Sequence, residues 1–200
     1  MSTRDRMLDA AAHVMRTRGL ARATTKEIAK AAGYSEAALY KHFRDKTDIF
    51  LAVLAERVPG TFSAVLANLA ERTGEGCVQN TLEEIARAAL GFYHETFVMA
   101  ASVFSEPRLL AAHRAAVRER DAGPHHISDT VANYIEAEQN RGRLRVDADP
   151  RAAANLLLGA CFQHAFLNRF ADTTMDDKTA EHTAAALSRT LFWGLAPEQP

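Results

Sequence analysis

Between residues 36 and 43 the sequence carries side chains whose types suit contact with a nucleic acid. If these residues form a helix, Leu39 and Phe43 lie one turn apart and point inward. The outward side chains are then acidic, small, aromatic and basic: Glu36, Ala37, Tyr40 and Lys41. A small residue permits close approach to a major groove, and the longer side chains reach phosphates and base edges. The pattern predicts a DNA-reading surface.

Two short helices joined by a tight turn are expected to position these side chains. Thr24 and Glu27 have the spacing of a capping box, in which the hydroxyl accepts a backbone N–H and the carboxylate reaches back. A helix should therefore start at Thr25. Gly33 supplies the positive φ of the turn, and Ser35 can cap the second helix.

The whole stretch TTKEIAKAAGYSEAALYKHFRDK, residues 24–46, resembles the helix-turn-helix of the TetR family of one-component bacterial regulators. The shared pattern is a Thr-led helix, Ala-Gly, then Leu-Tyr-x-His-Phe and a Lys. The resemblance covers the N-terminal quarter through these motifs and the remainder through its helix layout. It implies an all-α protein that binds double-stranded DNA.

The resemblance also implies roles for single residues. Phosphate contacts are implied for Thr25, Tyr40, His42 and Lys46. Positions where base edges are read are occupied by Lys26, Glu36, Ala37 and Tyr40. Glu36 departs from the family pattern, because a carboxylate repels phosphate. It could accept a hydrogen bond from a cytosine amino group, or act as a first-turn acid that favours the helix dipole.

Charge is distributed unevenly along the 200 residues, although the net charge is only −1. Residues 1–46 hold ten Lys and Arg against five Asp and Glu, whereas the remainder holds fourteen against twenty. The basic end is the expected nucleic-acid face. A solvated helical surface is the alternative, which a charge of this size does not exclude.

Apolar periodicity predicts helices along the whole chain and no β segment. We expect a three-helix DNA-binding head over residues 1–46 and a larger helical body for regulation and dimerisation over residues 47–200. Ser2 or Thr3 caps the first helix and Gly19 ends it, while Asp45 caps a fourth helix that Pro59-Gly60 kinks or breaks. Further helices are expected over residues 78–103, 107–121, 124–141, 150–170 and 178–193.

The helix expected from Pro150 to Phe170 is apolar nearly all round, which is more than one core face requires. A second buried face is therefore expected. The last helix is also amphipathic, and two such closing helices can pair with their copies as a four-helix bundle. The family resemblance implies that this bundle is the interface of a homodimer, which predicts a palindromic operator.

Apolar and aromatic residues on the middle helices could line a ligand pocket, with a histidine as its polar anchor. The candidates are Phe62, Leu66, Tyr93, His94, Phe97, Phe104, Phe162 and Phe166. Side chains at this spacing are also typical of an ordinary core. The family resemblance favours the pocket and a small, largely apolar or aromatic effector.

The sequence contains no motif of a known enzyme or metal site, such as HExxH, GxSxG, a Walker loop or GxGxxG. We expect no catalysis, no cofactor and no metal, with Cys77 and Cys161 as small apolar residues. The start lacks the pattern of a secretory signal, and the apolar runs are too short to span a bilayer. A cytoplasmic protein without membrane contact is expected.

These expectations combine into a transcriptional regulator, a repressor released from its operator by a small molecule. Two alternatives remain. One is a TetR-like architectural or division-control protein whose body docks a protein partner, since SEAALYKHF also resembles the nucleoid-occlusion subgroup. The other is an enzyme or metal protein with an incidental helix-turn-helix pattern.

Overall fold

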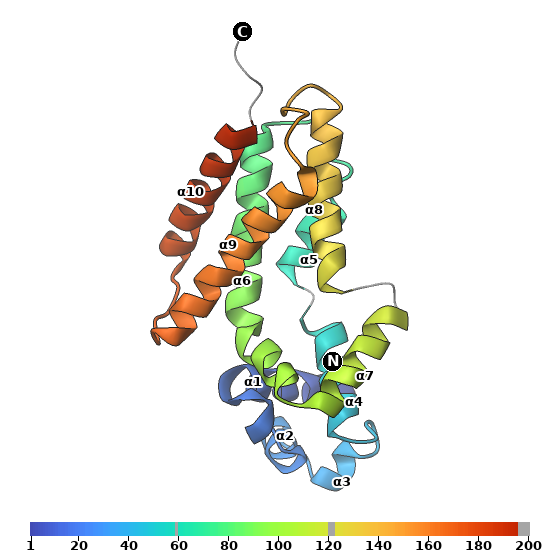
Figure 1. The fold of residues 1–200 in the computed structure, drawn as a ribbon. Coiled ribbons are helices and arrows are strands. Elements are labelled where there is room, and N and C mark those ends of the chain that lie inside the picture. Colours follow the sequence, from blue (N-terminus) through green and yellow to red (C-terminus); the bar gives the residue numbers. More distant parts are fainter. Residues whose placement is uncertain (59, 120–122, 196–200) are drawn as a thin grey trace. The chain divides into compact units, whose positions relative to one another are not determined.

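A computed structural model describes residues 1–58, 60–119 and 123–195. Within these ranges the chain is helical and contains no strand (Figure 1), which confirms the expected all-α class. The helices are α1 (Thr3–Arg22), α2 (Thr25–Ala32), α3 (Glu36–Leu39), α4 (Lys46–Glu56), α5 (Thr61–Ala67), α6 (Val78–Phe104), α7 (Pro107–Glu119), α8 (Pro124–Gln139), α9 (Pro150–Phe170) and α10 (Asp177–Leu195).

Two compact units share the chain. The first consists of residues 1–60 and 95–121, and the second of residues 61–94 and 122–200. The long helix α6 therefore contributes residues to both units. These two units are groups of residues in contact, whereas the expected boundary at residue 46 divides the chain by function. The functional boundary therefore stays a prediction.

The first unit is built around the apolar faces of α1, α2 and α4. Met7, Leu8 and Met15 of α1 are fully buried together with Ile28 of α2 and Phe50 of α4. Met99 and Val103 from the C-terminal part of α6, and Leu109 of α7, belong to the same core. Helix α1 is interrupted at Gly19, whose φ of 73° and ψ of 168° are not helical. The predicted end at Gly19 is thus a break, after which one more turn reaches Arg22.

The second unit has its own core, to which α5, α6, α8, α9 and α10 contribute. Helix α8 packs along α9, and α10 packs against α9 from another side (Figure 1). The fully buried Glu138 of α8 accepts a hydrogen bond from the backbone N–H of Gly74 at 2.8 Å and pairs with Arg143 at 3.2 Å. This buried carboxylate fastens the turn between α5 and α6 to the end of α8.

Most helix ends lie close to the positions that the capping residues and prolines of the sequence predicted. Helix α9 spans Pro150–Phe170 as expected, and Asp149 caps it by accepting the backbone N–H of Ala152. Asp45 caps α4 in the same way through Asp48. Pro59 and Asp121, at which a helix break and a helix end were expected, lie outside the described residues.

Among the described residues no single helix combines the length and apolarity needed to cross a membrane. Helices α4 and α5 meet that criterion only when taken together across their break, and only by length and composition.

Candidate nucleic-acid interface

The helix-turn-helix unit forms from the caps that the sequence indicated. The Thr24 hydroxyl accepts the backbone N–H of Glu27 at 3.2 Å, so α2 begins at Thr25. Gly33 ends α2 with φ 77° and ψ 28°, a left-handed conformation that a side chain would strain. Ser35 then caps α3 by accepting the backbone N–H of Ala38.

Only half of the expected capping box at α2 is present. The backbone N–H of Thr24 donates to the carbonyl of Arg22 at 3.0 Å, and the Glu27 carboxylate accepts from Arg18 at 2.9 Å. The expectation that Glu27 reaches back to the cap is therefore wrong. A neighbouring carbonyl already occupies the cap N–H, and a guanidinium offers the carboxylate a charged donor. The reciprocal box occurs at α1 instead, between Ser2 and Asp5.

The recognition segment presents the predicted outward face. Leu39 and Phe43 are buried, while Tyr40 is 51% exposed. Ala37, Lys41 and His42 are exposed as well, as is Lys26 of α2. Helix α3 itself has only four residues, but backbone hydrogen bonds from Lys41, His42 and Phe43 continue the winding. The face therefore reaches from residue 36 to residue 43.

Three candidate DNA-contacting residues are hydrogen-bonded to one another. The Thr25 hydroxyl donates to Glu36 Oε1 in a short contact, and the Tyr40 hydroxyl donates to Thr25 Oγ1 at 3.4 Å. Thr25 begins α2 and Glu36 begins α3, so this chain of bonds ties the starts of both helices together. Residue types and spacing did not indicate this pairing, because the partners lie 11 and 15 residues apart.

Lys46 is the first residue of α4 and is half-buried. Its Nζ donates to the Leu20 carbonyl oxygen at 2.6 Å, and the Leu20 backbone N–H donates to Ser102 Oγ at 3.2 Å. Ser102 Oγ in turn donates to the Val98 carbonyl at 2.8 Å. The peptide groups around Leu20 thus connect Lys46 to the C-terminal part of α6.

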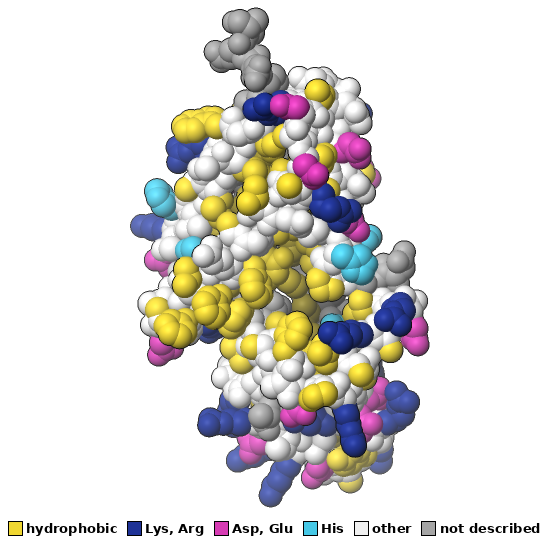
Figure 2. All heavy atoms as spheres, in the orientation of Figure 1, with side chains coloured by type: hydrophobic (Ala, Val, Ile, Leu, Met, Phe, Trp, Pro, Cys, Tyr) yellow, Lys and Arg dark blue, Asp and Glu magenta, His cyan; other side chains and the backbone are white. Residues whose placement is uncertain are grey.

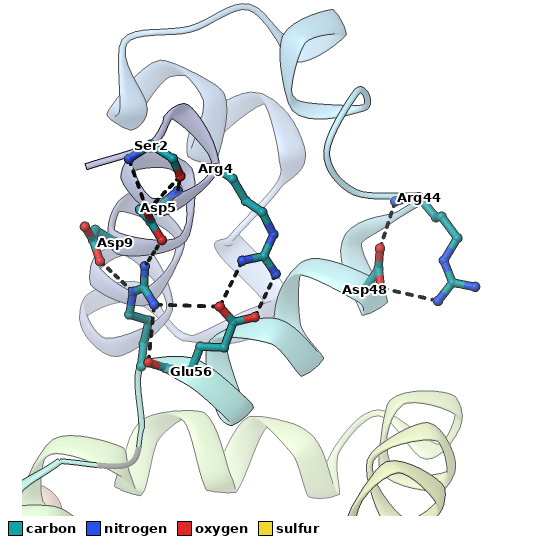
Figure 3. A network of polar contacts seen from close by, with 8 residues as sticks. Ser2, Arg4, Asp5, Asp9, Arg44, Asp48 and Glu56 are labelled. Carbon is teal, nitrogen blue, oxygen red and sulfur yellow. Dashed lines mark hydrogen bonds and ion pairs between the residues drawn. The ribbon is translucent and has the colours of Figure 1, made fainter.

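An ion-pair network, which the sequence did not indicate, holds the end of α4 against α1 (Figure 3). Arg4 binds both oxygens of Glu56, at 2.9 and 2.7 Å. Arg57 binds Asp9 at 2.7 Å and Asp5 at 3.0 Å. Hydrogen bonds from Ser2, with Arg57 beside it, lower the pKa of Asp5 from its ordinary 3.8 to about 2. The network fixes the helix that carries Lys46.

In the second unit several candidate pocket residues meet in an aromatic cluster. The Tyr93 ring lies 6.4 Å from Phe62 and 5.5 Å from Phe162 between centroids, and Phe92 lies 5.3 Å from both Phe62 and Tyr93. Leu66 packs against the same core. Burial raises the pKa of Tyr93 to about 12.

The other candidate pocket residues are placed differently. The backbone carbonyl of His94 accepts from Arg169 at 2.8 Å. Phe166 stacks on Phe170 at 6.1 Å. Phe97 and Phe104 belong to the first unit, where Phe104 is 70% exposed.

A cleft with a volume of about 540 Å³ opens between α9 and α10 in the second unit. Small and aliphatic side chains dominate it, and none of the eight candidate pocket residues lines it. Leu156, on the rim of α9, is 67% exposed. Phe170 and Trp193 are 83% and 71% exposed on the same two helices. Figure 2 shows hydrophobic side chains gathered along this part of the second unit.

The capped helix pair with its exposed reading face defines a helix-turn-helix DNA-binding protein. A family model described as "Bacterial regulatory proteins, tetR family" matches residues 7–53. A second, "AefR-like transcriptional repressor, C-terminal domain", matches residues 80–193, which is more than half of the chain. The chain belongs to the TetR family of transcriptional regulators.

Two curated relatives match part of the chain. The chain is 44% identical over 55 residues to the transcriptional regulator SrpR of Pseudomonas putida, covering 28% of this chain and 26% of SrpR. It is 32% identical over 90 residues to the nucleoid occlusion factor SlmA of Haemophilus influenzae, covering 44% of this chain and 40% of SlmA. The matches therefore span less than two thirds of either relative.

Solved structures share the fold along nearly the whole chain. A transcriptional regulator from Rhodococcus sp. Rha1 has a TM-score of 0.71 at 20% identity and covers 99% of this chain and 100% of its own. SmeT, the repressor of the Stenotrophomonas maltophilia multidrug efflux pump SmeDEF, has a TM-score of 0.65 at 22% identity and covers 99% and 92%. SmeT has also been solved in a complex with triclosan.

Proposed function

We propose that this protein is a homodimeric repressor that binds a palindromic operator and releases it when a small, largely apolar or aromatic ligand binds. The observation that carries the proposal is the exposed face of the recognition segment, where Leu39 and Phe43 are buried while Tyr40 is exposed. Membership of the TetR family supports the same function. The protein would act in the cytoplasm, where the chromosome is accessible.

We propose two sets of DNA contacts on this face. Phosphates are bound by His42, Lys41 and Lys46, with Thr25 and Tyr40 as further candidates that rest on the family resemblance. Base edges are read by Lys26, Glu36, Ala37 and Tyr40. Phosphate contacts fix the register of the protein on the duplex, and base contacts supply the sequence preference.

The proposed homodimer forms through α9 and α10. A single recognition segment reads only a few base pairs, so a two-fold pair of heads supplies the remaining contacts. Leu156, Phe170 and Trp193 are exposed apolar side chains on these two helices, and a second copy would cover them. Leu156→Glu and Phe170→Glu should yield monomers in sedimentation at micromolar concentration. Phe104→Glu, at an exposed apolar residue of the first unit, is the matched control and should leave the dimer intact.

The proposed ligand site is the region of Phe62, Tyr93 and Phe162, where aromatic rings contact one another in the second unit. The SmeT complex with triclosan is a precedent in the same fold. A compound that weakens operator binding must itself bind more weakly to the DNA-bound protein, with a coupling on the order of 1–3 kcal/mol. A thermal-shift screen of apolar compounds, followed by operator titrations with each hit, tests this link. Hits that stabilise the protein without changing operator affinity contradict it.

The similarity to SlmA favours a second candidate, an architectural DNA-binding protein whose body docks a protein partner. Mapping the DNA sites that the protein occupies across the genome distinguishes the repressor from the architectural protein. Binding beside one gene or a few genes, with increased transcription when the protein is deleted, supports the repressor. Many sites spread around the chromosome, with unchanged transcription of neighbouring genes, support the architectural role.

A further inference from the structure

The hydrogen bonds among Thr25, Glu36 and Tyr40 constrain what these side chains can offer to DNA. A hydroxyl group has one proton to donate. The Thr25 proton goes to Glu36 Oε1, and the Tyr40 proton goes to Thr25 Oγ1. A phosphate oxygen is an acceptor and needs a donor, so in this arrangement neither hydroxyl supplies one. The network instead presents acceptors.

The second carboxylate oxygen of Glu36 is the strongest of these acceptors. Of the two Glu36 carboxylate oxygens, only Oε1 has a hydrogen-bond partner among the described residues. The Glu36 side chain lies half-exposed at the start of α3. The exposed Ala37 beside it leaves room for close approach to the groove. The exposed Lys41 of the recognition segment supplies a positive charge for a phosphate.

Carboxylates in a major groove recognise a particular partner, the exocyclic amino group of cytosine. We infer that Thr25 is a positioning residue that holds the Glu36 carboxylate, and that Glu36 accepts a hydrogen bond from a cytosine amino group in each half-site. This inference rests on the proposed function. It assigns Thr25 a role different from the phosphate contact that the family resemblance implied, and it selects base recognition for Glu36.

A negative charge on the reading face also affects binding to unrelated DNA. Glu36 lies where it would repel the phosphate backbone, so it weakens sequence-independent binding while favouring one base pair. Removing the carboxylate should therefore act in opposite directions on the two kinds of binding. A residue with only a structural role would lower both together.

The operator is first identified by selecting, from random double-stranded DNA, the sequences that the wild-type protein binds. The test then measures binding to this operator, to operators substituted at each position, and to an unrelated duplex of equal length. Glu36→Ala should reduce the preference for one C·G pair in each half-site about tenfold, with equal or tighter binding to the unrelated duplex. Glu36→Gln should shift the preference at that pair towards adenine, because an amide pairs with its N6 and N7. Such a gain cannot result from misfolding.

Substitutions at Thr25 test its positioning role without touching the carboxylate. Thr25→Val, which keeps the shape and removes the hydroxyl, should lose the same C·G preference, and Thr25→Ser should retain it. The double variant Thr25→Val/Glu36→Ala should distinguish the C·G pair from other base pairs as well as Glu36→Ala alone does. The two effects should not add, because both substitutions remove the same interaction.

Three outcomes would overturn the inference: an unchanged base preference in Glu36→Ala, equal weakening of all duplexes by Glu36→Ala, or equal weakening of all duplexes by Thr25→Val. The last would return Thr25 to the phosphate contacts. If the wild-type protein selects no sequence at all, the proposed function fails. If it selects an inverted repeat that Glu36→Ala selects equally well, only the inference fails.

Discussion

The ammonium group of Lys46 donates to the backbone carbonyl of Leu20 at 2.6 Å, so this basic residue at the start of α4 is anchored to the end of α1. An ammonium carries three donors, and one is used here. The other two can meet a phosphate without breaking the bond to Leu20. In the proposed complex with DNA, the anchor places a positive charge beside a phosphate and reduces the side-chain freedom lost on binding.

Replacing Lys46 by Ala should weaken binding to all DNA sequences by a similar factor, because phosphates carry no sequence information. The slope of log affinity against log salt should fall by about one. Titrations at several salt concentrations measure both effects. Lys30→Ala removes the same charge from an exposed site on α2 outside the proposed contacts, and it should change the slope less. A sequence-selective loss with an unchanged slope would count against the phosphate contact.

Ser102→Ala should destabilise the first unit. The backbone N–H of the buried Leu20 would lose its acceptor, which typically costs about 1–3 kcal/mol of unfolding free energy. Chemical denaturation followed through the helical signal measures the change. Ser105→Ala is a suitable control, because Ser105 is exposed and donates only to the Ser102 carbonyl. Equal effects of the two substitutions would show that the bond to Leu20 contributes little.

Helix positions were predictable because their signals are local. Thr24, Ser35, Asp45 and Asp149 cap helices with a side chain that bonds three residues along the chain. Gly33 lies where a left-handed turn is required. Such signals need no knowledge of distant residues, so residue types and spacing suffice.

The side-chain network of the candidate interface was not predictable in the same way. The bonds from Arg57 to Asp5 and from Lys46 to Leu20 join residues 52 and 26 positions apart. No periodicity relates such partners, because the packing of several helices brings them together. The cleft between α9 and α10 has the same origin, since it depends on how two amphipathic helices meet.

The first unit should lose stability in acid partly through Asp5. Its pKa is about 2 in the folded protein against an ordinary 3.8, so the unfolded chain takes up the proton first as the pH falls. The contribution is present above about pH 4 and is lost as the pH approaches 2. Asp5→Asn should flatten the fall in the urea midpoint between pH 5 and pH 3. Identical acid profiles for the variant and the wild type would contradict this role.

The flattening should be partial, because a backbone hydrogen bond from Arg44 also lowers the pKa of Asp48, and the side-chain hydrogen bond from Arg4 lowers the pKa of Glu56. Asp5 and Asp48 are partly exposed and Glu56 is exposed, so added salt should reduce the difference between Asp5→Asn and the wild type.

The two cysteines should differ strongly in reactivity. Burial raises the pKa of the Cys161 thiol to about 12, whereas Cys77 is exposed in the segment before α6. Since the thiolate is the nucleophile, Cys77 should be alkylated readily at pH 8 and Cys161 only when the second unit opens. Mass spectrometry of time-quenched samples locates the label. Fast labelling that persists in Cys77→Ser would show that Cys161 is accessible.

The most direct test of the proposed function is selection of bound sequences from a pool of random double-stranded DNA, combined with the mass of the protein–DNA complex. A homodimer with one reading face per protomer should enrich an inverted repeat whose half-sites are spaced by about one helical turn. The complex should contain two protomers, or a multiple of two, per operator. No enriched sequence, or tight binding of one protomer to a single half-site, would contradict the account.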